Sequence, residues 1–351
     1  ILAALLAALL VVVLKKPLLA LVVLIGGGIG ALALQQRAFD SWNLILPMLA
    51  PVLAWGSTGL FALAWDFVLE RRQKDKLRSA ITRYFSPDMA EEILRKPDSY
   101  FRTLGGVQRE ITVLFSDLRG FTSLSEKHPP GKLVRQLNQY LERMVEITFQ
   151  RQGSIDKFIG DAIMAVWGRI RDGADDAALA EDAVHAIATA LKMRSGLDEL
   201  NRQWSAEGSP PLAIGIGIHQ GSAIVGNMGC TAKMEFTAIG DSVNLSARLE
   251  SATKQYGVDL IVSQPVAEKA AGHFRFRSAD LVVVKGKKQP VQIHAVLGDL
   301  STPAPAGLGD YEEGVSLFRL GAFDKARLSF EMAAVCGLAD EGVVVGRHLV
   351  Q

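Results

Sequence analysis

The sequence predicts an α+β domain preceded by transmembrane α-helices, and three features of the chain lead to this prediction. Residues 1–65 are almost uncharged. Residues 108–298 alternate apolar runs of strand length with amphipathic stretches of helix length. Within that second region, Asp117 and Asp161 each lie at the end of an apolar run that is typical of a buried strand.

Length and composition narrow the possible functions. The chain has 351 residues, which suggests two or three domains. A formal net charge of +1 gives no overall field that would attract nucleic acid, so no nucleic-acid partner is expected. Cys230 and Cys336 are the two cysteines, too few for a disulfide framework and suited to a reducing compartment. The chain starts at Ile1 inside an apolar run, so we expect an upstream part to be missing.

Residues 1–70 are predicted to anchor the chain in a lipid bilayer through three spans. Leu18–Leu34 and Trp42–Trp65 contain no charged residue, and Ile1–Leu14 has the composition of a truncated first span. A helix of about 20 apolar residues crosses the hydrocarbon core of a bilayer. A buried helical hairpin of a soluble protein is the alternative interpretation.

Basic residues next to these spans predict the orientation. They lie in the first loop and directly after the last span: Lys15, Lys16, Arg71, Arg72, Lys74 and Lys76. The positive-inside rule then puts everything after residue 70 in the cytoplasm, with a bacterial inner membrane as the natural setting. Within the spans, Gly26 and Gly30 are expected to form a close helix-packing face rather than a nucleotide-binding loop.

Residues 71–107 are predicted to form a helical connector. The stretch Asp66–Leu94 alternates charged and apolar residues, so much of it is expected to continue the last span as a helix. Pro87 should end that helix and begin a second one over Pro87–Leu94, with Ser86 as its N-cap. Two interpretations stay open: a solvated linker, or a short parallel coiled coil that transmits motion between two chains.

Residues 108–298 are predicted to form the main α+β domain. Strands are expected at 111–116, 154–159, 162–167, 212–219, 222–227, 234–239, 258–263, 281–285 and 291–296. Helices are expected at 131–151, 175–202, 241–253 and 264–271. The early order β-α-β-β-α-β resembles the ferredoxin-like split unit. In that layout Asp117 ends the first strand and Asp161 lies in a hairpin turn, so strand pairing should bring both carboxylates to one edge.

Two carboxylates at one sheet edge indicate a metal site, because burying an unpaired charge is costly and hard cations prefer carboxylate oxygens. Three motifs around them resemble the class III nucleotidyl cyclases. The motifs are Phe115-Ser-Asp-Leu-Arg-Gly-Phe-Thr122, Phe158-Ile-Gly-Asp-Ala162 and Glu235-Phe-Thr-Ala-Ile-Gly-Asp-Ser-Val-Asn-Leu-Ser-Ala-Arg-Leu-Glu250. Their order and spacing match that family over about 190 residues. Thr237 resembles the membrane-anchored bacterial subgroup of adenylyl cyclases in which a threonine replaces the more usual aspartate as a reader of adenine.

The resemblance implies a ferredoxin-like cyclase domain that acts as a homodimer, with two sites at the subunit interface. Each site would draw residues from both chains. Asp117 and Asp161 would hold two Mg²⁺ or Mn²⁺ per site, with the Leu118 carbonyl as a further ligand. One cation would lower the pKa of the ribose 3′-hydroxyl, and the other would neutralise charge on the phosphates.

The resemblance also implies how the site selects its base. Lys157 would donate to a ring nitrogen of adenine, and the Thr237 hydroxyl would accept from the exocyclic amine. Guanine presents an N–H and a carbonyl oxygen at those positions, so a guanine reader needs a carboxylate and a small neutral group. The residues present therefore favour ATP over GTP as the substrate.

The remaining predicted roles concern the ribose and the phosphates. Asn244 and Arg248 are four apart, so a helix presents them on one face, Asn244 to orient the ribose and Arg248 to stabilise charge on the α-phosphate. Arg248 in a surface ion pair is the alternative. Backbone N–H groups at Phe121 and Thr122 open a helix and are expected to bind phosphate oxygens. Lys285 would reach the β- and γ-phosphates, although its lysine-rich segment also suits a solvated turn.

The sequence thus predicts a membrane-bound adenylyl cyclase that converts ATP to 3′,5′-cyclic AMP and pyrophosphate in signal transduction. A guanylyl cyclase and a non-catalytic nucleotide-binding signalling scaffold are the alternatives. The resemblance extends to receptors whose extracytoplasmic sensor precedes the spans, so we expect such a sensor upstream. Residues 299–351 are predicted to be a linker followed by a helical tail that resembles one tetratricopeptide unit, which is free to dock on the cyclase domain or to belong to a longer array.

Overall fold

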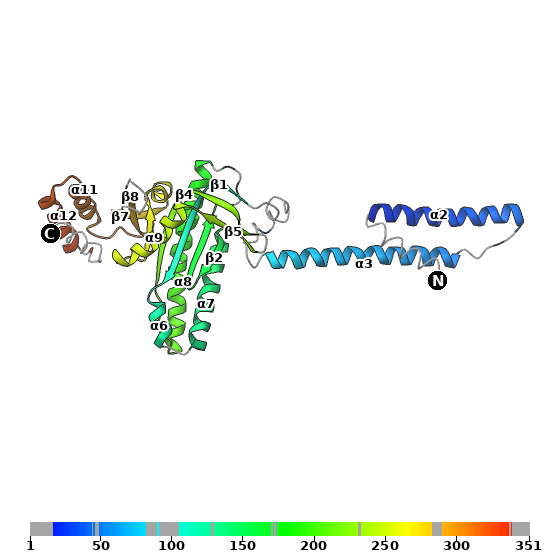
Figure 1. Ribbon diagram of the computed structural model, residues 1–351, viewed down its shortest axis with the longest axis horizontal. Helices are drawn as coiled ribbons and strands as arrows, with labels where there is room; N and C mark the ends of the chain where they lie inside the picture. The colour runs from blue at the N-terminus through cyan, green and yellow to red at the C-terminus, as the bar shows by residue number, and fades with distance from the viewer. Residues whose placement is uncertain are drawn as a thin grey trace. The chain divides into compact units, whose positions relative to one another are not determined.

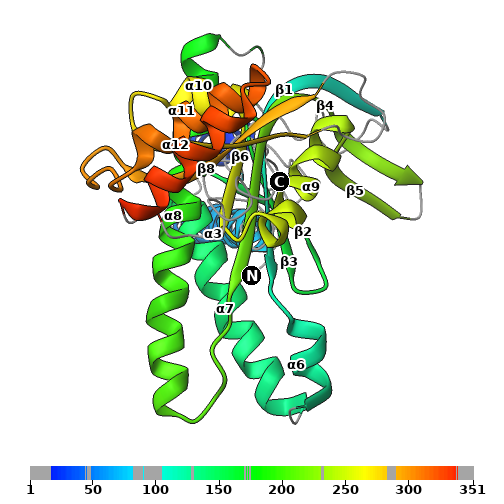
Figure 2. The same cartoon turned by 90° about the vertical axis from the view of Figure 1, so that its left-hand side faces the viewer.

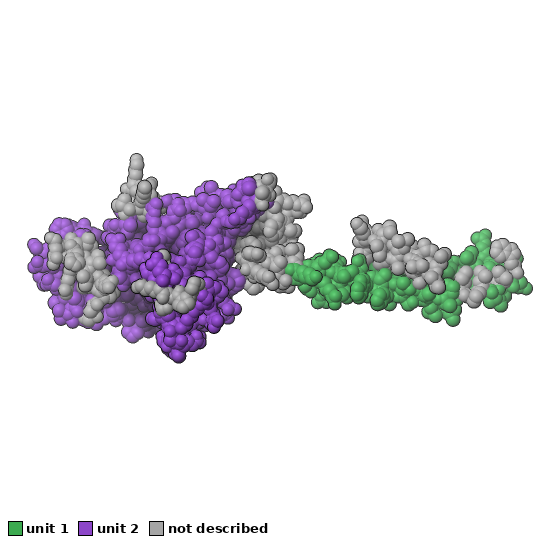
Figure 3. Space-filling model, turned by 60° about the horizontal axis from the view of Figure 1, so that its bottom comes forward, with its two compact units in different colours: residues 1–81 green, residues 82–351 purple. Residues whose placement is uncertain are grey.

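The computed structural model describes residues 17–43, 45, 49–81, 90, 105–127, 130–169, 171, 173, 175–230, 233–282, 290–336 and 338. The chain divides into two compact units, residues 1–81 and residues 82–351 (Figure 3). Unit 1 is described as helices alone, and unit 2 contains the strands.

Unit 1 is an antiparallel helical hairpin of α2 (Pro17–Trp42) and α3 (Leu49–Ile81) (Figure 1). Each helix contains a stretch that is long and apolar enough to cross a membrane, Leu21–Ser41 and Leu49–Lys76. The helices touch where the Trp55 indole donates to the Leu24 carbonyl at 3.0 Å. Helix α3 continues well beyond Trp65, which confirms that the last span extends as a helix into the following segment.

One detail of the predicted spans is wrong. The second span does not begin at Trp42, because Trp42 ends α2 and Asn43 follows it with φ 50°, a left-handed conformation that closes helices. The glycines at the contact between α2 and α3 are Gly27 and Gly59, since a Cβ added at Gly27 would lie 2.8 Å from the Trp55 ring and one at Gly59 would meet Leu24. No described residue packs against Gly26 or Gly30, so their packing face stays a prediction. The predicted spans and helix at Ile1–Leu14 and Pro87–Leu94 fall outside the described residues, apart from Ala90.

Unit 2 is built on one mixed sheet, and it begins with the predicted β-α-β-β-α-β order, with two helices in place of one between the first and second strands. The strands are β1 (Gly105–Leu118), β2 (Ser154–Ile159), β3 (Ala162–Trp167), β4 (Ile214–Cys230), β5 (Lys233–Ile239), β6 (Leu260–Ser263), β7 (Phe274–Val282) and β8 (Val291–Asp299). The order across the sheet is β2-β3-β1-β4-β6-β8-β7, with β5 paired to β4 beside this path. In the order β4-β1-β3-β2, each strand is antiparallel to the next one, which confirms the ferredoxin-like split unit.

Helices cover both faces of this sheet (Figure 2). They are α6 (Phe121–Lys127), α7 (Pro130–Gln150), α8 (Asp176–Ala206), α9 (Asp241–Gln255) and α10 (Gln264–Ala270). Successive residues of a strand point to opposite faces. Leu114 accordingly belongs to a buried cluster with α7, α8 and α10, whereas Val113 belongs to a second cluster with β5 and α9. The site residues described below lie at the margins of these two layers.

Strand β4 differs from the prediction of two strands at 212–219 and 222–227. It runs unbroken because it pairs with β1 along the whole length of that strand, from Gly105 to Leu118. Gly221 lies in the gap between the two predicted strands and gives room for α9, since a Cβ there would lie 2.7 Å from the Ser242 hydroxyl. Gly217 serves the same purpose, because its Cβ would lie 2.1 Å from the Glu250 nitrogen.

Strand β7 also differs from the prediction, which began a strand at 281. It starts at Phe274 and pairs with β8 as far as Val282. The tail forms the predicted pair of helices, α11 (Leu308–Arg319) and α12 (Phe323–Val335). This pair docks on β7, where the Ser278 N–H donates to Glu312 at 2.6 Å and the Arg277 guanidinium lies 5.1 Å from the centre of the Tyr311 ring.

Candidate active site

Asp117 and Asp161 meet at one edge of the sheet, as the sequence predicts. Asp117 is the second-to-last residue of β1, and Asp161 lies in the tight turn between β2 and β3. Strands β1 and β3 pair as far as Ser116 and Ile163, which places Asp117 beside that turn. The two carboxyl groups are close enough to hydrogen bond, and burial followed by the charge of Asp161 raises the pKa of Asp117.

The surroundings of this pair are partly buried. Beneath it, the Tyr140 hydroxyl and the Ser116 hydroxyl lie 3.1 Å apart in the core. On α9, Glu250 is buried and one of its oxygens, Oε1, has no hydrogen-bond partner among the described residues. Burial, and then the negative charge of Asp117, raises the pKa of Glu250. Three acidic side chains therefore gather at this edge, where the nearby Lys254 opposes both rises in pKa and Arg119 opposes the one at Glu250.

These residues fit a divalent cation. Two adjacent carboxylates repel one another when both are ionised, and a cation between them removes that repulsion. Within the described part of the chain, no group of three or more His, Cys, Asp and Glu side chains is arranged to hold a metal. A cation at Asp117 and Asp161 would therefore complete its coordination with backbone, water or substrate oxygens. Leu118 ends β1 directly beside the pair.

The predicted base readers, Lys157 and Thr237, also lie near one another although their strands are far apart in the sheet. Lys157 is on β2 and Thr237 on β5, with β3, β1 and β4 between them in the sheet order. Side chains nevertheless join the two strands. The Lys157 ammonium lies 3.0 Å from Glu235, and the Thr237 hydroxyl donates to Asp156 at 2.6 Å.

Three charged residues at the contact between β2 and β5 were missed by the sequence analysis. Asp156 precedes Lys157 and forms an ion pair of 2.7 Å with Arg169, and the two side chains are 0% and 2% exposed. Glu235 is exposed, and the neighbouring Lys157 lowers its pKa. The available signal was Asp156 itself, a carboxylate between the apolar Ile155 and the predicted base reader Lys157.

Asn244 and Arg248 lie on the exposed side of α9, four residues apart, as predicted. The opposite side of the helix is buried through Leu245, Leu249 and other residues. Phe121 begins α6 and is partly buried.

Two further predicted residues are not fully described. Thr122 belongs to α6, but its side chain lies outside the described part of the structure. Lys285 lies outside the described residues altogether.

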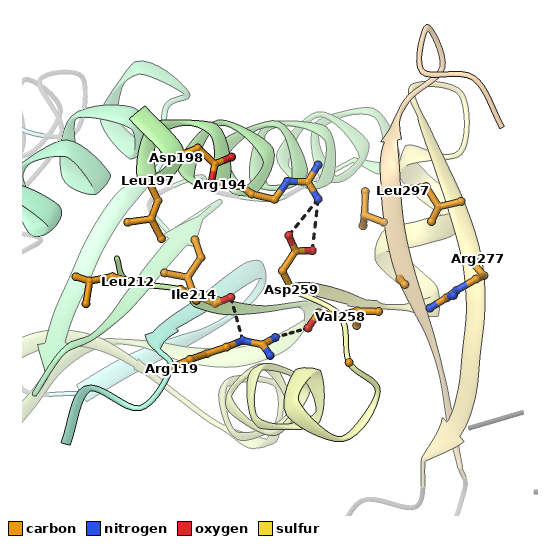
Figure 4. Close-up of a pocket in the computed structure, with 14 residues that line it drawn as sticks. Arg119, Arg194, Leu197, Asp198, Leu212, Ile214, Val258, Asp259, Arg277 and Leu297 are labelled. Carbon is orange, nitrogen blue, oxygen red and sulfur yellow. Dashed lines mark hydrogen bonds and ion pairs between the residues drawn. The ribbon is translucent and has the colours of Figure 1, made fainter. Parts of the chain in front are cut away.

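A pocket of about 500 Å³ lies elsewhere, between α8, the start of β4 and strand β8 (Figure 4). Its charged lining is engaged within the chain. Arg119 donates to the Ile214 carbonyl at 3.3 Å and to the Val258 carbonyl, and Arg194 lies 3.2 Å from Asp259. None of the predicted metal, base or ribose residues lines this pocket.

Comparison with known families decides what this arrangement belongs to. The sequence profile of the family described as "Adenylate and Guanylate cyclase catalytic domain" matches residues 106–298, which is more than half of the chain. The chain belongs to this family. The match includes every described residue of the metal pair, the base readers and the α9 pair, so all of them are part of the cyclase domain.

Curated relatives of the cyclase domain include an "Adenylate cyclase" of Anabaena cylindrica, 40% identical over 195 residues. That alignment covers 54% of this chain and 37% of the relative. "Adenylate cyclase 1" of Rhizobium meliloti is 30% identical, with 61% of this chain and 32% of the relative covered. The chain thus spans about a third of the length of these relatives.

Solved structures confirm the fold of the cyclase domain. The adenylyl cyclase CyaB from P. aeruginosa is 36% identical with a TM-score of 0.50, over 55% of this chain and 96% of that chain. The guanylyl cyclase Cya2 is also 36% identical, with a TM-score of 0.51 over 56% of this chain and 95% of that chain. Because the two are equally similar, overall likeness does not discriminate between adenine and guanine as the base.

Proposed function

We propose that the chain is a membrane-anchored adenylyl cyclase that converts ATP to 3′,5′-cyclic AMP and pyrophosphate. The observation that carries this proposal is the meeting of Asp117 with Asp161 in a domain that also presents Lys157 and Thr237. The first pair suits phosphate chemistry with a divalent cation, and the second pair suits adenine.

The base is selected by hydrogen-bond polarity. Adenine offers a ring-nitrogen acceptor and an amine donor, which complement the Lys157 ammonium and the Thr237 hydroxyl oxygen. Guanine offers a ring N–H and a carbonyl oxygen instead, so the lysine would face a donor. A site that leaves such polar groups unpaired rejects the wrong substrate strongly. The equal similarity to a guanylyl cyclase structure keeps GTP as the competing substrate.

The reaction forms a bond between the ribose 3′-oxygen and the α-phosphorus and breaks the bond from that phosphorus to the leaving pyrophosphate. Asp117 and Asp161, with the Leu118 carbonyl, would hold two divalent cations per site, and bound cations would supply a lower pKa for the 3′-hydroxyl and neutral charge around the phosphates. Asn244 orients the ribose, and Arg248 stabilises the charge that grows on the α-phosphate. Phe121 and Thr122 supply backbone N–H groups, and Lys285 supplies a charge, for the outer phosphates.

Two chains would build each site. The resemblance to the class III cyclases implies a homodimer. In the proposed homodimer, one protomer contributes the metal pair, and its partner contributes Lys157, Thr237, Asn244 and Arg248. One feature supports this division: Asn244 and Arg248 lie on the exposed side of α9, where a partner chain can reach them.

The two apolar helices of unit 1 support anchoring in a bilayer, by their length and composition. In the proposed layout, residues 1–70 span a bacterial inner membrane and 71–107 connect to a cytoplasmic cyclase domain at 108–298. Residues 299–351 are the linker and tail. An extracytoplasmic sensor upstream of the spans would supply the signal.

The test is product formation by the full chain in membranes, with Mn²⁺ and either ATP or GTP. The proposal expects cyclic AMP from ATP, with little cyclic GMP from GTP. Cyclic GMP as the main product would make the chain a guanylyl cyclase. Binding of either nucleotide without turnover would support the signalling scaffold instead.

A further inference from the structure

The hydroxyl of Thr237 has a defined direction in this structure. It donates its proton to Oδ2 of Asp156 at 2.6 Å. The other carboxylate oxygen of Asp156 receives the N–H of Ala238 at 3.3 Å and the guanidinium of Arg169 at 2.7 Å. Asp156 is therefore held from two sides while it accepts from Thr237.

This direction matters because a threonine hydroxyl has one proton and two lone pairs. A hydroxyl that rotates freely can accept from the adenine amine or donate to the guanine carbonyl. An ionised carboxylate can only accept, so Asp156 takes the one proton that Thr237 has to give. The oxygen of Thr237 then offers a bound base a lone pair and nothing else.

We propose that Asp156, held in place by Arg169, is a positioning residue that makes Thr237 an obligate hydrogen-bond acceptor and so sets the preference for adenine. This inference rests on the proposed function, in which Thr237 contacts the base. It adds Asp156 to the residues that select the base, beside Lys157 and Thr237.

Packing keeps the carboxylate in position. The Asp156 and Arg169 side chains are buried, and Arg169 also donates to the Phe236 carbonyl and lies 4.7 Å from the centre of the Phe236 ring. Pairing of β2 with β3 shifts register between Ile155 and Lys157, so Asp156 lies at a bulge, and bulges redirect side chains. Strand β5 is thereby fixed to β2 at the position where Thr237 lies.

The inference also accounts for how one fold suits both bases. The adenylyl and guanylyl cyclase structures resemble this chain to the same degree. The choice of base must then depend on whether a few side chains donate or accept hydrogen bonds. The direction in which Thr237 gives its proton is one of these features.

The first experiment compares kcat/KM for ATP and for GTP in the full chain and in Asp156→Asn. The new amide can donate to Thr237, which frees the threonine proton for the guanine carbonyl. The ratio of kcat/KM for ATP to kcat/KM for GTP should fall about tenfold, which is the effect expected when one hydrogen bond changes its donor and acceptor. Both substrates are measured on one preparation, so partial unfolding cancels in the ratio. An unchanged ratio would overturn the inference.

The second experiment leaves the Asp156–Arg169 pair intact, in case Asp156→Asn does not fold. In Thr237→Asn, the amide nitrogen should donate to Asp156 and the amide oxygen should accept from adenine, so the ATP preference should persist. Loss of that preference would show that Asp156 does not fix the polarity of residue 237.

A control for the first experiment uses Asp156→Asn again. In the Thr237→Val background, which has no hydroxyl, Asp156→Asn should not change the ratio of kcat/KM for ATP and GTP any further.

These outcomes are separable from failure of the proposed function. A wild-type chain that makes neither cyclic AMP nor cyclic GMP would refute the enzyme proposal itself. A wild-type chain that prefers ATP, with a ratio that Asp156→Asn does not change, would refute only the role of Asp156.

Discussion

The cyclase domain contains two carboxylate centres that balance their charge in opposite ways. At the sheet edge, Asp117 lies against Asp161, and burial together with this like charge raises the pKa of Asp117. Between β2 and β5, Asp156 is buried against Arg169 at 2.7 Å. The first centre is incomplete within the protein and suits an added cation, whereas the second is complete and can act as a fixed support.

The pair of Asp117 and Asp161 is called the unbalanced centre below, and the pair of Asp156 and Arg169 the balanced centre. The largest expected effect is on catalysis at the unbalanced centre. Asp117→Ala or Asp161→Ala should each lower cyclic AMP formation by about a thousandfold or more, because each removes a cation ligand where charge is neutralised. The measurement is turnover of the full chain with Mn²⁺ and ATP. Glu142→Ala, an exposed change on α7, is the matched control and should retain activity. Activity that survives both aspartate changes would rule out the metal assignment.

The balanced centre should respond mainly in stability. Arg169→Leu leaves the Asp156 carboxylate buried without its partner, so the free energy of unfolding should fall by about 3–5 kcal/mol. Urea unfolding of the full chain, followed by a cyclase-domain signal, measures this loss. Replacing Asp156 and Arg169 together with leucine should destabilise less than Arg169→Leu alone. Equal losses would show that the pair is not coupled.

Base preference should change when the readers themselves are exchanged. Lys157→Glu with Thr237→Cys provides the carboxylate and small neutral group that guanine needs, so the preference should shift toward GTP by about tenfold or more. The ratio of kcat/KM for GTP and ATP measures the shift. Lys157→Glu places a second carboxylate near Glu235, so Glu235→Gln in the same background is the control for repulsion. No shift in either background would remove Lys157 and Thr237 from base selection.

The smallest effect concerns the metal-free stability of the unbalanced centre. The pKa of Asp117 is higher in the folded state than in the unfolded state, so the folded state holds the proton more tightly. The free energy of unfolding therefore falls as pH rises from the unfolded pKa through the folded pKa. Asp117→Asn does not titrate, so at neutral pH without metal it should melt slightly above wild type. Mn²⁺ should raise the melting temperature of wild type and leave that of Asp117→Asn nearly unchanged. A lower melting temperature for Asp117→Asn without metal would contradict the repulsion.

The comparison also shows why one centre was predictable from sequence and the other was not. Asp117 and Asp161 flank strands that the β-α-β-β-α-β order makes neighbours, so their meeting follows from local topology. Asp156 and Thr237 lie on β2 and β5, which three strands separate in the sheet order. Their contact depends on how β5 curves across the sheet face, and residue periodicity carries no signal for that curvature.

The errors in the fold have a similar origin. The gap between the predicted strands at 212–219 and 222–227 includes Gly221, but β4 runs through it because β4 pairs with β1 along the whole of β1. Gly221 instead gives room for α9. Helix α3 packs over Gly27, a residue that the spacing of Gly26 and Gly30 did not indicate. In both cases the partner is a distant segment that the local sequence does not reveal.

In the proposed dimer, the unbalanced centre of one protomer works with the base-reading and α9 residues of its partner. Mixing Asp117→Ala chains with Arg248→Ala chains tests it most directly, because each variant alone lacks a complete site. Cyclic AMP formation should return to about a quarter of wild type, since half of randomly paired dimers are mixed and each mixed dimer keeps one intact site. A mixture as inactive as its components would contradict the shared site.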